Sequence, residues 1–448
     1  MKTKLQKNIF ILTLPIFIEL AFFILMGSVD TIMISAYEKT FSYALGSVAA
    51  VGNASTVINL FGVLLNVVST GIAVVVSQYL GAQKEDEAKK TIYTGIFIQF
   101  FIGLGIAALL LFLGNTLFIL IGTPKEIVGL SYDYLFYTAI SLLFVSITNA
   151  ISASLRSYGH AKEVTKTVIV ANVFNVIFNY ILIYGYGFFP EMGVAGAALS
   201  TMLMRFFTMM VSFVLLKRII GLNIFKVSYN GDYARKIFKV GLPSALESMT
   251  YNTMQFVILS FVNKLGTEMI TARTYVNTML SYIYLFSGAF ASGNAIITGY
   301  YIGEEDIEGA YKNTLKTVLY TLSIVGSVVL LVNLFATPIA KFFTDDPLII
   351  KTIRQVLWFA ILLEVGRALN LVVIQALRAT GDTTFPLVMA VFSMLGVGIT
   401  CAYLFSQTLG LGLLGVYLGI SVDELFRGFT MLTRWLKKTW VNKSLVRG

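Results

Sequence analysis

Ten ionisable residues lie inside long apolar stretches of this 448-residue sequence. A charge at the centre of a bilayer costs about 2.5–3.5 kcal/mol or more, so such residues pair with one another or serve a function. Proton transfer, cation binding and ion pairing are the chemistries open to them. The residues are Glu19, Asp30, Glu247, Glu364, Asp423, Glu424, Arg205, Arg273, Arg367 and Arg427.

Asp30 is the strongest candidate for ion chemistry, because no arginine shares its apolar stretch. Asn175 and Asn179 are four residues apart and therefore face the same side of a helix. A carboxylate with amide oxygens suits a proton carrier or a small hard cation such as Na⁺. We therefore expect Asp30, Asn175 and Asn179 to form a cation-coupling site. Plain helix–helix hydrogen bonding is the alternative for the asparagines.

A second polar group lies in a later apolar stretch. Glu364 and Arg367 are three residues apart, so they can neutralise each other across one helical turn. Asn370 projects from the same side of that helix. This group is either a structural ion pair or part of a functional polar site. Two acids and an arginine at 423–427 are expected to pack and anchor the last helix.

The sequence repeats itself once. Leu155-Arg156-x-x-Gly159 returns as Leu377-Arg378-x-x-Gly381, a shift of 222 residues. Pro15-x-x-x-Glu19 returns as Pro243-x-x-x-Glu247, a shift of 228. Transporters place substrate sites between such repeats. The duplication therefore favours a cavity-lining role for Glu247, the repeat of Glu19.

The composition predicts a helical membrane protein. Hydrophobic residues make up 57% of the chain and charged residues 12%, whereas soluble proteins average about 25% charged residues. The net charge of +10 comes mostly from loops on one side and from both ends, which is a topology signal and not a nucleic-acid footprint. The single Cys401 excludes a disulfide framework and a thiolate metal site, and the single His160 has no partner histidine or cysteine with which to bind a metal.

We expect an all-α polytopic fold with twelve transmembrane helices in two pseudo-symmetric six-helix lobes around a central cavity. The predicted domains are an amino-terminal lobe (1–216), an inter-lobe cytoplasmic linker (217–239), a carboxy-terminal lobe (240–436) and a cytoplasmic tail (437–448). The charge bias places both termini in the cytoplasm. The predicted spans are 9–36, 45–80, 91–121, 128–153, 163–186, 193–216, 237–263, 267–301, 312–341, 349–376, 384–407 and 413–435.

Several motifs resemble those of the multidrug and toxic compound extrusion (MATE) transporters. They occur in the family's order over nearly the whole chain. The motifs are Leu14-Pro15-x-x-x-Glu19, Val29–Ser35, Gln78–Gln83, Leu155-Arg156-x-x-Gly159, Asn175-x-x-x-Asn179-Tyr180, Gly193–Ala198, Gly241-Leu242-Pro243-x-x-x-Glu247 and Leu377-Arg378-x-x-Gly381-Asp382.

The resemblance implies export of drugs or metabolites in exchange for H⁺ or Na⁺. Asp30 matches the family's first-span acid, and Asn175 matches a family asparagine of the fifth span. Asn179 stands where some archaeal-type members carry an aspartate. Glu247 matches a second-lobe acid of some bacterial members. Arg367 stands where those members have an aspartate, and an arginine there would repel a metal cation, so we expect coupling through the first lobe.

We further expect small organic cations as substrates, bound in a cavity or second-lobe polar site formed by Glu19, Glu247, Glu364, Arg367 and Asn370. No phosphate-binding G-x-x-x-x-G-K-[ST] motif is present, so we expect no nucleotide partner. We also expect no cofactor beyond the coupling ion, H⁺ or Na⁺. We expect no metal site other than a Na⁺ site at Asp30, and no nucleic-acid partner. The expected protein is a non-enzymatic, monomeric antiporter of the bacterial cytoplasmic membrane, embedded in the lipid bilayer.

Two other functions remain open. A flippase of the same superfamily that moves lipid-linked oligosaccharides would share the spans and the repeat, but it favours a strongly cationic cavity. A membrane-embedded transferase would need a catalytic carboxylate–histidine or metal cluster, and His160 is the single histidine. Dye efflux driven by an imposed ion gradient would separate both from an antiporter.

Overall fold

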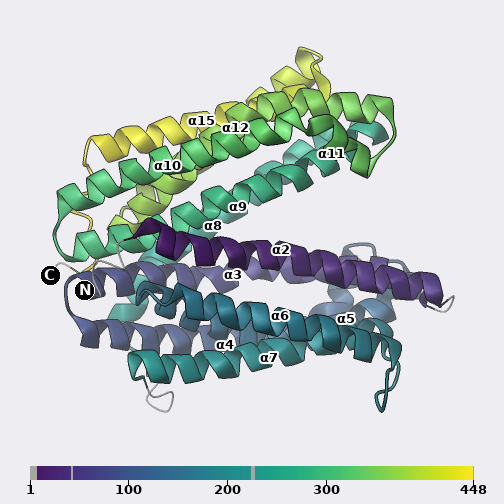
Figure 1. Ribbon diagram of the computed structural model, residues 1–448, viewed down its shortest axis with the longest axis horizontal. Helices are drawn as coiled ribbons and strands as arrows, with labels where there is room; N and C mark the ends of the chain where they lie inside the picture. The colour runs from purple at the N-terminus through teal and green to yellow at the C-terminus, as the bar shows by residue number, and fades with distance from the viewer. Residues whose placement is uncertain (1–7, 42–43, 223–227, 447–448) are drawn as a thin grey trace. The chain divides into compact units, whose positions relative to one another are not determined.

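The computed structural model describes residues 8–41, 44–222 and 228–446, apart from the side chain of Ser28, and every regular element in these ranges is helical (Figure 1). The elements are α2 (Ile9–Thr40), α3 (Ser47–Gly81), α4 (Glu85–Leu120), α5 (Lys125–Ser157), α6 (Ala161–Tyr184), α7 (Gly193–Ile220), α8 (Gly231–Asn263), α9 (Thr267–Gly303), α10 (Ile307–Leu334), α11 (Ala336–Phe343), α12 (Pro347–Thr380), α13 (Thr384–Val391), η3 (Phe392–Gly398), α14 (Ile399–Tyr403), η4 (Leu404–Thr408) and α15 (Gly412–Leu436).

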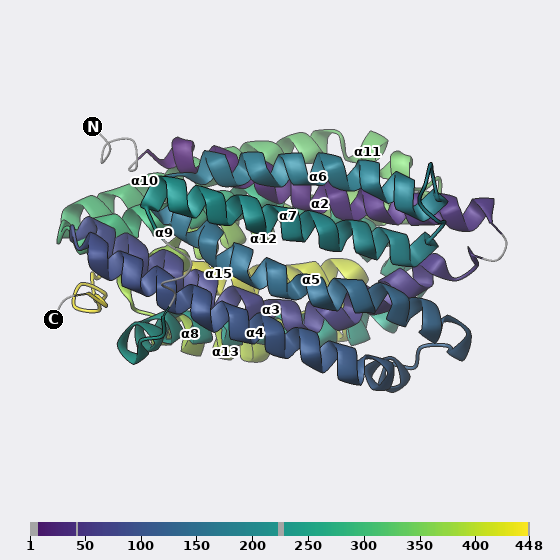
Figure 2. The same ribbon diagram turned by 90° about the horizontal axis from the view of Figure 1, so that it is seen from below.

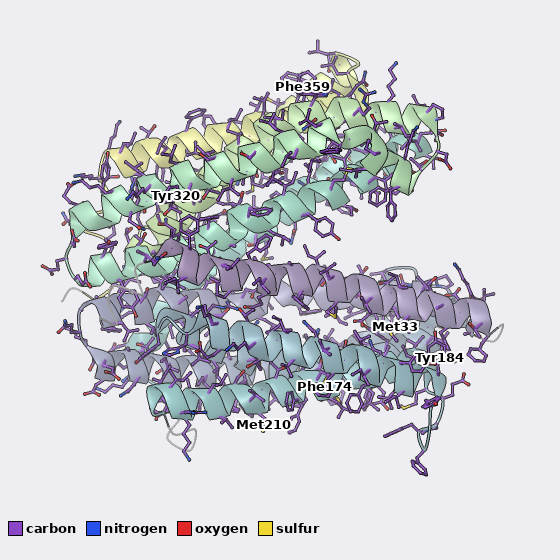
Figure 3. The ribbon with its side chains drawn as sticks, in the orientation of Figure 1. Met33, Phe174, Tyr184, Met210, Tyr320 and Phe359 are labelled. Atoms are coloured by element: carbon purple, nitrogen blue, oxygen red, sulfur yellow. The ribbon has the colours of Figure 1, made fainter. Side chains whose placement is uncertain are left out.

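Among the described residues, ten helices are long and apolar enough to cross a membrane. One of them is the continuous run from α13 to η4. The helices α8 and α15 are of similar length but contain no stretch that is as apolar and as poor in charge. Large apolar side chains cover the outside of these helices. Phe174, Met210 and Phe359 are 46%, 40% and 42% exposed (Figure 3). Apolar surface on this scale needs lipid around it, so the chain is a multi-pass membrane protein.

The ninth predicted span, 312–341, is interrupted. The chain forms α10 up to Leu334 and then the short α11, with a break at Phe335. Pro338 contributes to this break, because proline has no backbone N–H and fits only the first turn of a helix. At the predicted linker, α7 continues to Ile220 and α8 begins at Gly231, so helix extends into both ends of 217–239.

The chain divides into two compact units. The amino-terminal unit comprises Ile18–Val76 and the described residues of Glu85–Gly241. The carboxy-terminal unit comprises the described residues up to Phe17, Ser77–Lys84, and those from Leu242 onward. The first helix of each sequence half therefore contributes to both units. The boundary between the units falls after Phe17 in α2 and after Gly241 in α8.

A proline lies within two residues of each changeover, Pro15 in α2 and Pro243 in α8. The start of α2 packs against α9, where the rings of Phe17 and Phe286 lie 4.5 Å apart. A proline inside a helix removes one backbone hydrogen bond and favours a kink. Each crossing helix is thus weakest near the point where it passes from one unit to the other.

In the amino-terminal unit, α5 packs against α4 and α7, and α6 packs against α7 (Figures 1 and 2). Leu110, Phe118 and Leu135 are fully buried between α4 and α5. A second cluster joins the far half of α2 to α6 and α7 through Ile34 and Tyr37. Tyr37 donates a hydrogen bond of 2.7 Å to Glu191, which fixes this end of α2.

In the carboxy-terminal unit, α12 is the central helix and packs against α9, α10 and α15 (Figure 1). Asp346 caps its first turn by accepting hydrogen bonds from the backbone N–H groups of Leu348 (2.8 Å) and Ile349 (3.2 Å). Two π-helical segments, η3 and η4, interrupt the neighbouring span. Such segments often occur at functional sites.

Small residues allow close helix contacts at the motifs that repeat at 193–198 and 415–419. A Cβ atom on Gly196 would lie 2.5 Å from the Leu182 carbonyl oxygen, and one on Gly419 would lie 2.3 Å from the Ala402 nitrogen. Both contacts involve backbone, which cannot move aside as a side chain can. Glycine is therefore required there by packing.

Gly419→Ala is expected to destabilise the protein by about 1–3 kcal/mol, because the added methyl group overpacks the contact with Ala402. Gly326→Ala is the matched control, since nothing lies within 4 Å of the added Cβ in α10. Thermal unfolding of the purified protein in detergent measures both. Equal unfolding temperatures for the two variants would contradict the packing argument.

Candidate functional site

The structure brings Asp30 and Asn179 together in the amino-terminal unit. The Asn179 amide nitrogen donates to the Asp30 carboxylate at 2.6 Å, which joins α2 to α6. Asn179 is fully buried and its amide oxygen has no hydrogen-bond partner among the described residues. The site therefore pairs a partly buried carboxylate with an unused amide acceptor.

Asn175 does not contact Asp30 directly. Its amide nitrogen donates to the Ser200 hydroxyl at 3.0 Å, and that hydroxyl donates back to the Asn175 backbone carbonyl at 3.1 Å. Asn179 also lies 3.5 Å from the Asn175 side-chain oxygen. Asn175 therefore fixes α6 to α7 and orients Asn179, and Asn179 is the residue that meets the acid.

A partly buried arginine acts electrostatically on the same carboxylate. Arg205 on α7 donates to the Ser141 hydroxyl on α5 at 2.7 Å, and its charge interacts with Asp30 and with the phenol of Tyr134. The site thus holds one acid and one arginine that come from different helices. The sequence shows both residues in apolar stretches, but no spacing rule connects them.

The repeated motifs form matching ion pairs. In the amino-terminal unit Arg156 of α5 pairs with Glu19 of α2, and in the carboxy-terminal unit Arg378 of α12 pairs with Glu247 of α8. The glutamates come from the two Pro-x-x-x-Glu motifs and the arginines from the two Leu-Arg-x-x-Gly motifs. Each pair fixes the first helix of a sequence half just beyond its proline. This pairing gives both glutamates a structural role.

The carboxy-terminal unit contains a second polar network, on α12 and α15. Arg367 pairs with Glu364 at 2.5 Å and lies 3.7 Å from Glu424. Arg427 pairs with Glu424 at 2.9 Å and with Asp423 at 2.7 Å. Carboxylates and guanidinium groups therefore alternate along one chain of contacts.

Two neutral side chains complete this network. The Asn370 amide nitrogen donates to Glu424 at 3.0 Å, and the Ser393 hydroxyl donates to Asp423 at 2.5 Å. Ser393 belongs to the π-helical segment η3. The predicted polar group of Glu364, Arg367 and Asn370 is therefore joined with the residues at 423–427 in one cluster.

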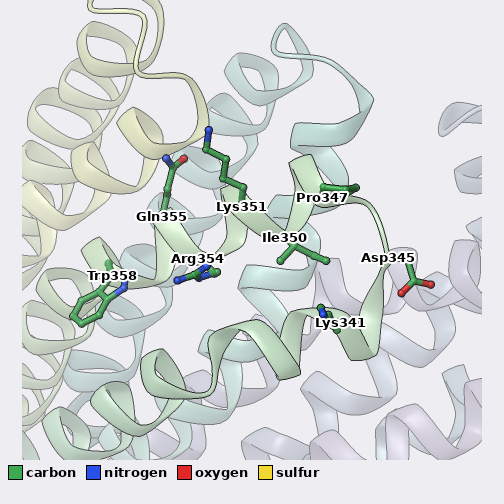
Figure 4. Close-up of a pocket in the computed structure, with 8 residues that line it drawn as sticks. All are labelled: Lys341, Asp345, Pro347, Ile350, Lys351, Arg354, Gln355 and Trp358. Carbon is green, nitrogen blue, oxygen red and sulfur yellow. The ribbon is translucent and has the colours of Figure 1, made fainter.

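A pocket of about 500 Å³ lies away from these clusters, at the turn between α11 and α12 (Figure 4). Its lining includes Lys341, Lys351, Arg354 and Trp358. None of the predicted site residues lines it. The cluster in the amino-terminal unit and the network in the carboxy-terminal unit are therefore the better candidates for ion chemistry.

The sequence did not identify Ser200, Ser141 or Ser393 as members of these sites. Serine is common in membrane helices and usually bonds to its own backbone, so its identity carries little signal. Arg205 was visible as a charge in an apolar stretch, which is the signal that could have placed it in the site. Among the described residues, no group of three or more His, Cys, Asp or Glu side chains is arranged to hold a metal ion.

The fold and these sites define a multi-pass helical membrane protein made of two related halves. The protein-family model described as MatE matches residues 15–181 and again residues 243–404. The chain is 34% identical over 441 residues to the uncharacterized transporter YisQ of Bacillus subtilis, covering 98% of this chain and 96% of the relative. It is 24% identical over 445 residues to the probable multidrug resistance protein NorM of Thermotoga maritima, covering 99% and 95%.

A solved structure of a MATE protein in complex with MaD3S superimposes with a TM-score of 0.87 at 22% identity, covering 98% of this chain and 99% of that one. The chain belongs to the MATE family of transporters. The double match of the family model confirms the internal repeat, and the predicted all-α polytopic fold of two six-helix halves is confirmed.

Removing Glu247 is expected to cost more stability than removing its repeat Glu19. The side chains of Arg378 and Glu247 are 10% and 13% exposed, whereas those of Arg156 and Glu19 are 27% and 20% exposed. Breaking a buried pair costs about 3–5 kcal/mol, and an exposed pair contributes about 0–1 kcal/mol. We therefore expect Glu247→Gln to lower the unfolding temperature more than Glu19→Gln, in thermal denaturation of the purified protein.

The reciprocal exchange is the control. Glu247→Arg combined with Arg378→Glu restores opposite charges at the two positions and should recover part of the lost stability. If the doubly exchanged variant is no more stable than either single variant, the ion pair does not hold α8 to α12. A larger fall in unfolding temperature for Glu19→Gln than for Glu247→Gln would contradict the prediction from burial.

Proposed function

We propose that this protein is a secondary active transporter that exports small organic cations in exchange for protons, with Asp30 as the coupling group. The observation that carries the proposal is the contact between Asp30 and Asn179 beside the charge of Arg205. A carboxylate held by a neutral amide and facing an arginine on another helix changes its interactions with both when it takes up a proton.

The proposed cycle follows from these contacts. Ionised Asp30 accepts the hydrogen bond from Asn179 and attracts Arg205, which draws α2 toward α6 and α7. Protonation removes the negative charge and weakens that attraction, so the far half of α2 can shift relative to the helices it packs against. Pro15 supplies a weak point near the other end of α2. Release of the proton restores the original arrangement and completes the exchange.

The arginine favours H⁺ over Na⁺ as the coupling ion. A sodium ion needs several oxygen ligands at once, and it would sit close to the positive charge of Arg205. A proton needs one oxygen of Asp30 and leaves the arginine paired with Ser141. The unused Asn179 oxygen can accept a hydrogen bond from the protonated acid.

The proposal also includes the membrane location, the oligomeric state and the substrate class. The loop charges support cytoplasmic termini in a bacterial cytoplasmic membrane, and the proposed protein acts as a monomer. The partly buried acids and abundant aromatic side chains support positively charged substrates. Relatives named as probable multidrug resistance proteins support drugs as substrates.

Asp30→Asn is expected to reduce proton-driven efflux by about tenfold or more, because it fixes the site in its neutral state and removes the coupling free energy. The measurement is efflux of a fluorescent organic cation from membrane vesicles under an imposed pH gradient, and in parallel under a sodium gradient. Unmodified protein should respond to the pH gradient and not to sodium.

Glu38→Gln provides the matched control on the same helix. Its carboxylate accepts hydrogen bonds from the backbone N–H groups of Gly46 (3.1 Å) and Val48 (2.8 Å), which is a capping role. This variant should keep most of the efflux. Near-normal proton-driven efflux by Asp30→Asn would remove Asp30 from the coupling mechanism.

A further inference from the structure

The network in the carboxy-terminal unit carries an unbalanced charge. It contains three carboxyl groups, Glu364, Glu424 and Asp423, and two guanidinium groups, Arg367 and Arg427. All three acids are buried, with exposures of 0%, 3% and 0%. If every group were ionised, one negative charge would remain in an apolar interior, where an unpaired charge is strongly disfavoured.

The hydrogen-bond pattern shows which acid differs from the others. Both oxygens of Glu424 are engaged, by the two arginines and by Asn370. Both oxygens of Asp423 are engaged, by Arg427 and Ser393. At Glu364, Oε1 accepts from Arg367, whereas Oε2 is buried and has no hydrogen-bond partner among the described residues.

We propose that Glu364 is a second proton-binding site, in which a proton on Oε2 neutralises the excess carboxylate while Oε1 keeps its contact with Arg367. The inference stands beside the proposed function and does not require Asp30 to couple transport. It concerns the other unit of the chain, and it predicts a carboxylic acid that is neutral while the rest of the network is charged.

The surroundings of Glu364 favour a proton over a metal ion. One carboxylate oxygen is already occupied by Arg367, so the residue offers a single ligand atom. Arg367 also interacts with Glu424 and with the phenols of Tyr251 and Tyr284, the latter ring lying 5.9 Å from the guanidinium carbon. A cation at Oε2 would therefore lie close to a fixed positive charge, whereas a proton adds only a covalent O–H bond.

One member of the network is partly exposed. The side chain of Arg367 is 12% exposed, whereas that of Glu364 is 0% exposed. Glu364 thus contacts the most exposed member of the chain of contacts. The unused oxygen of Asn370 is also buried within the same network, which adds a second acceptor able to take a hydrogen bond.

Infrared difference spectroscopy tests this proposal on the full chain reconstituted in lipid vesicles. An Asp30→Asn background removes the proposed coupling acid of the amino-terminal unit, and the comparison with Glu364→Gln then shows which pH-dependent carboxylic acid C=O band belongs to the network. We expect a band corresponding to about one carboxyl group per molecule, lost as the pH is raised, and absent when Glu364→Gln is added. A band that persists in the double variant, or no acid band at any pH, would overturn the assignment.

Glu268→Gln in the same background is the matched control, because Glu268 is another acid of this unit and is exposed in the first turn of α9. It should leave the band unchanged. Glutamine has the shape and charge of protonated glutamate, so Glu364→Gln should fold normally, and the fall in thermal stability that we expect as the pH is raised and Glu364 ionises should be absent in this variant. A Glu364→Gln variant that fails to fold would also contradict a neutral Glu364, whereas failure of the Asp30 efflux experiment would leave this result unaffected.

Discussion

The high cost of charge in an apolar medium is the constraint on which this structure depends. Each of the ten ionisable residues that the sequence places in apolar stretches meets a polar partner in the described structure, and the partners determine what each can do. Glu19 and Glu247 are neutralised by arginines. Arg273 and Arg205 bond to the neutral side chains of Gln255 and Ser141. Asp30 accepts a hydrogen bond from a neutral amide. A fixed partner of opposite charge suits a structural role, whereas a carboxylate held by a neutral amide suits the ion exchange that we propose for Asp30.

The duplicated and the unduplicated acids have different partners. The Glu–Arg pairs occur in both units, at matched motifs, and hold the first helix of each half. By contrast, a shift of 228 residues carries Asp30 onto Ile258, and a shift of 222 carries Asn179 onto Cys401. The proposed coupling site therefore has no equivalent in the other half. The repeated Glu–Arg pairs are therefore part of the architecture common to both halves. The unrepeated Asp30 is a property of the amino-terminal half alone.

The sequence predicted the elements of the fold well, because runs of apolar residues long enough to cross a bilayer leave few alternatives to helices. It also placed Asp30 and Asn179 in one site, since an isolated acid and two amides on one helical face need partners. It could not show that Glu19 belongs with Arg156, because a contact between residues 137 positions apart depends on how α2 packs against α5. It could not foresee η3 either, since π-helical turns have no strong residue preference, and so Ser393 was not connected with Asp423.

Equivalent arginines of the two halves interact with acids on different elements, and this decides whether the interaction changes when a helix shifts. Arg205 and Arg427 correspond at a shift of 222 residues. Arg427 pairs with two acids of its own helix, at spacings of three and four residues, and such pairs keep their geometry when the helix moves as a body. Arg205 instead faces an acid on another helix, so its interaction changes when α2 shifts against α7. In the carboxy-terminal unit Glu424 links α15 to α12, because it meets Arg367 and Asn370 of α12. Loss of a proton from Glu364 would increase the demand on Arg367 and weaken its hold on Glu424. A proton at Glu364 would therefore strengthen the contact between α12 and α15, whereas a proton at Asp30 would loosen the contacts of α2.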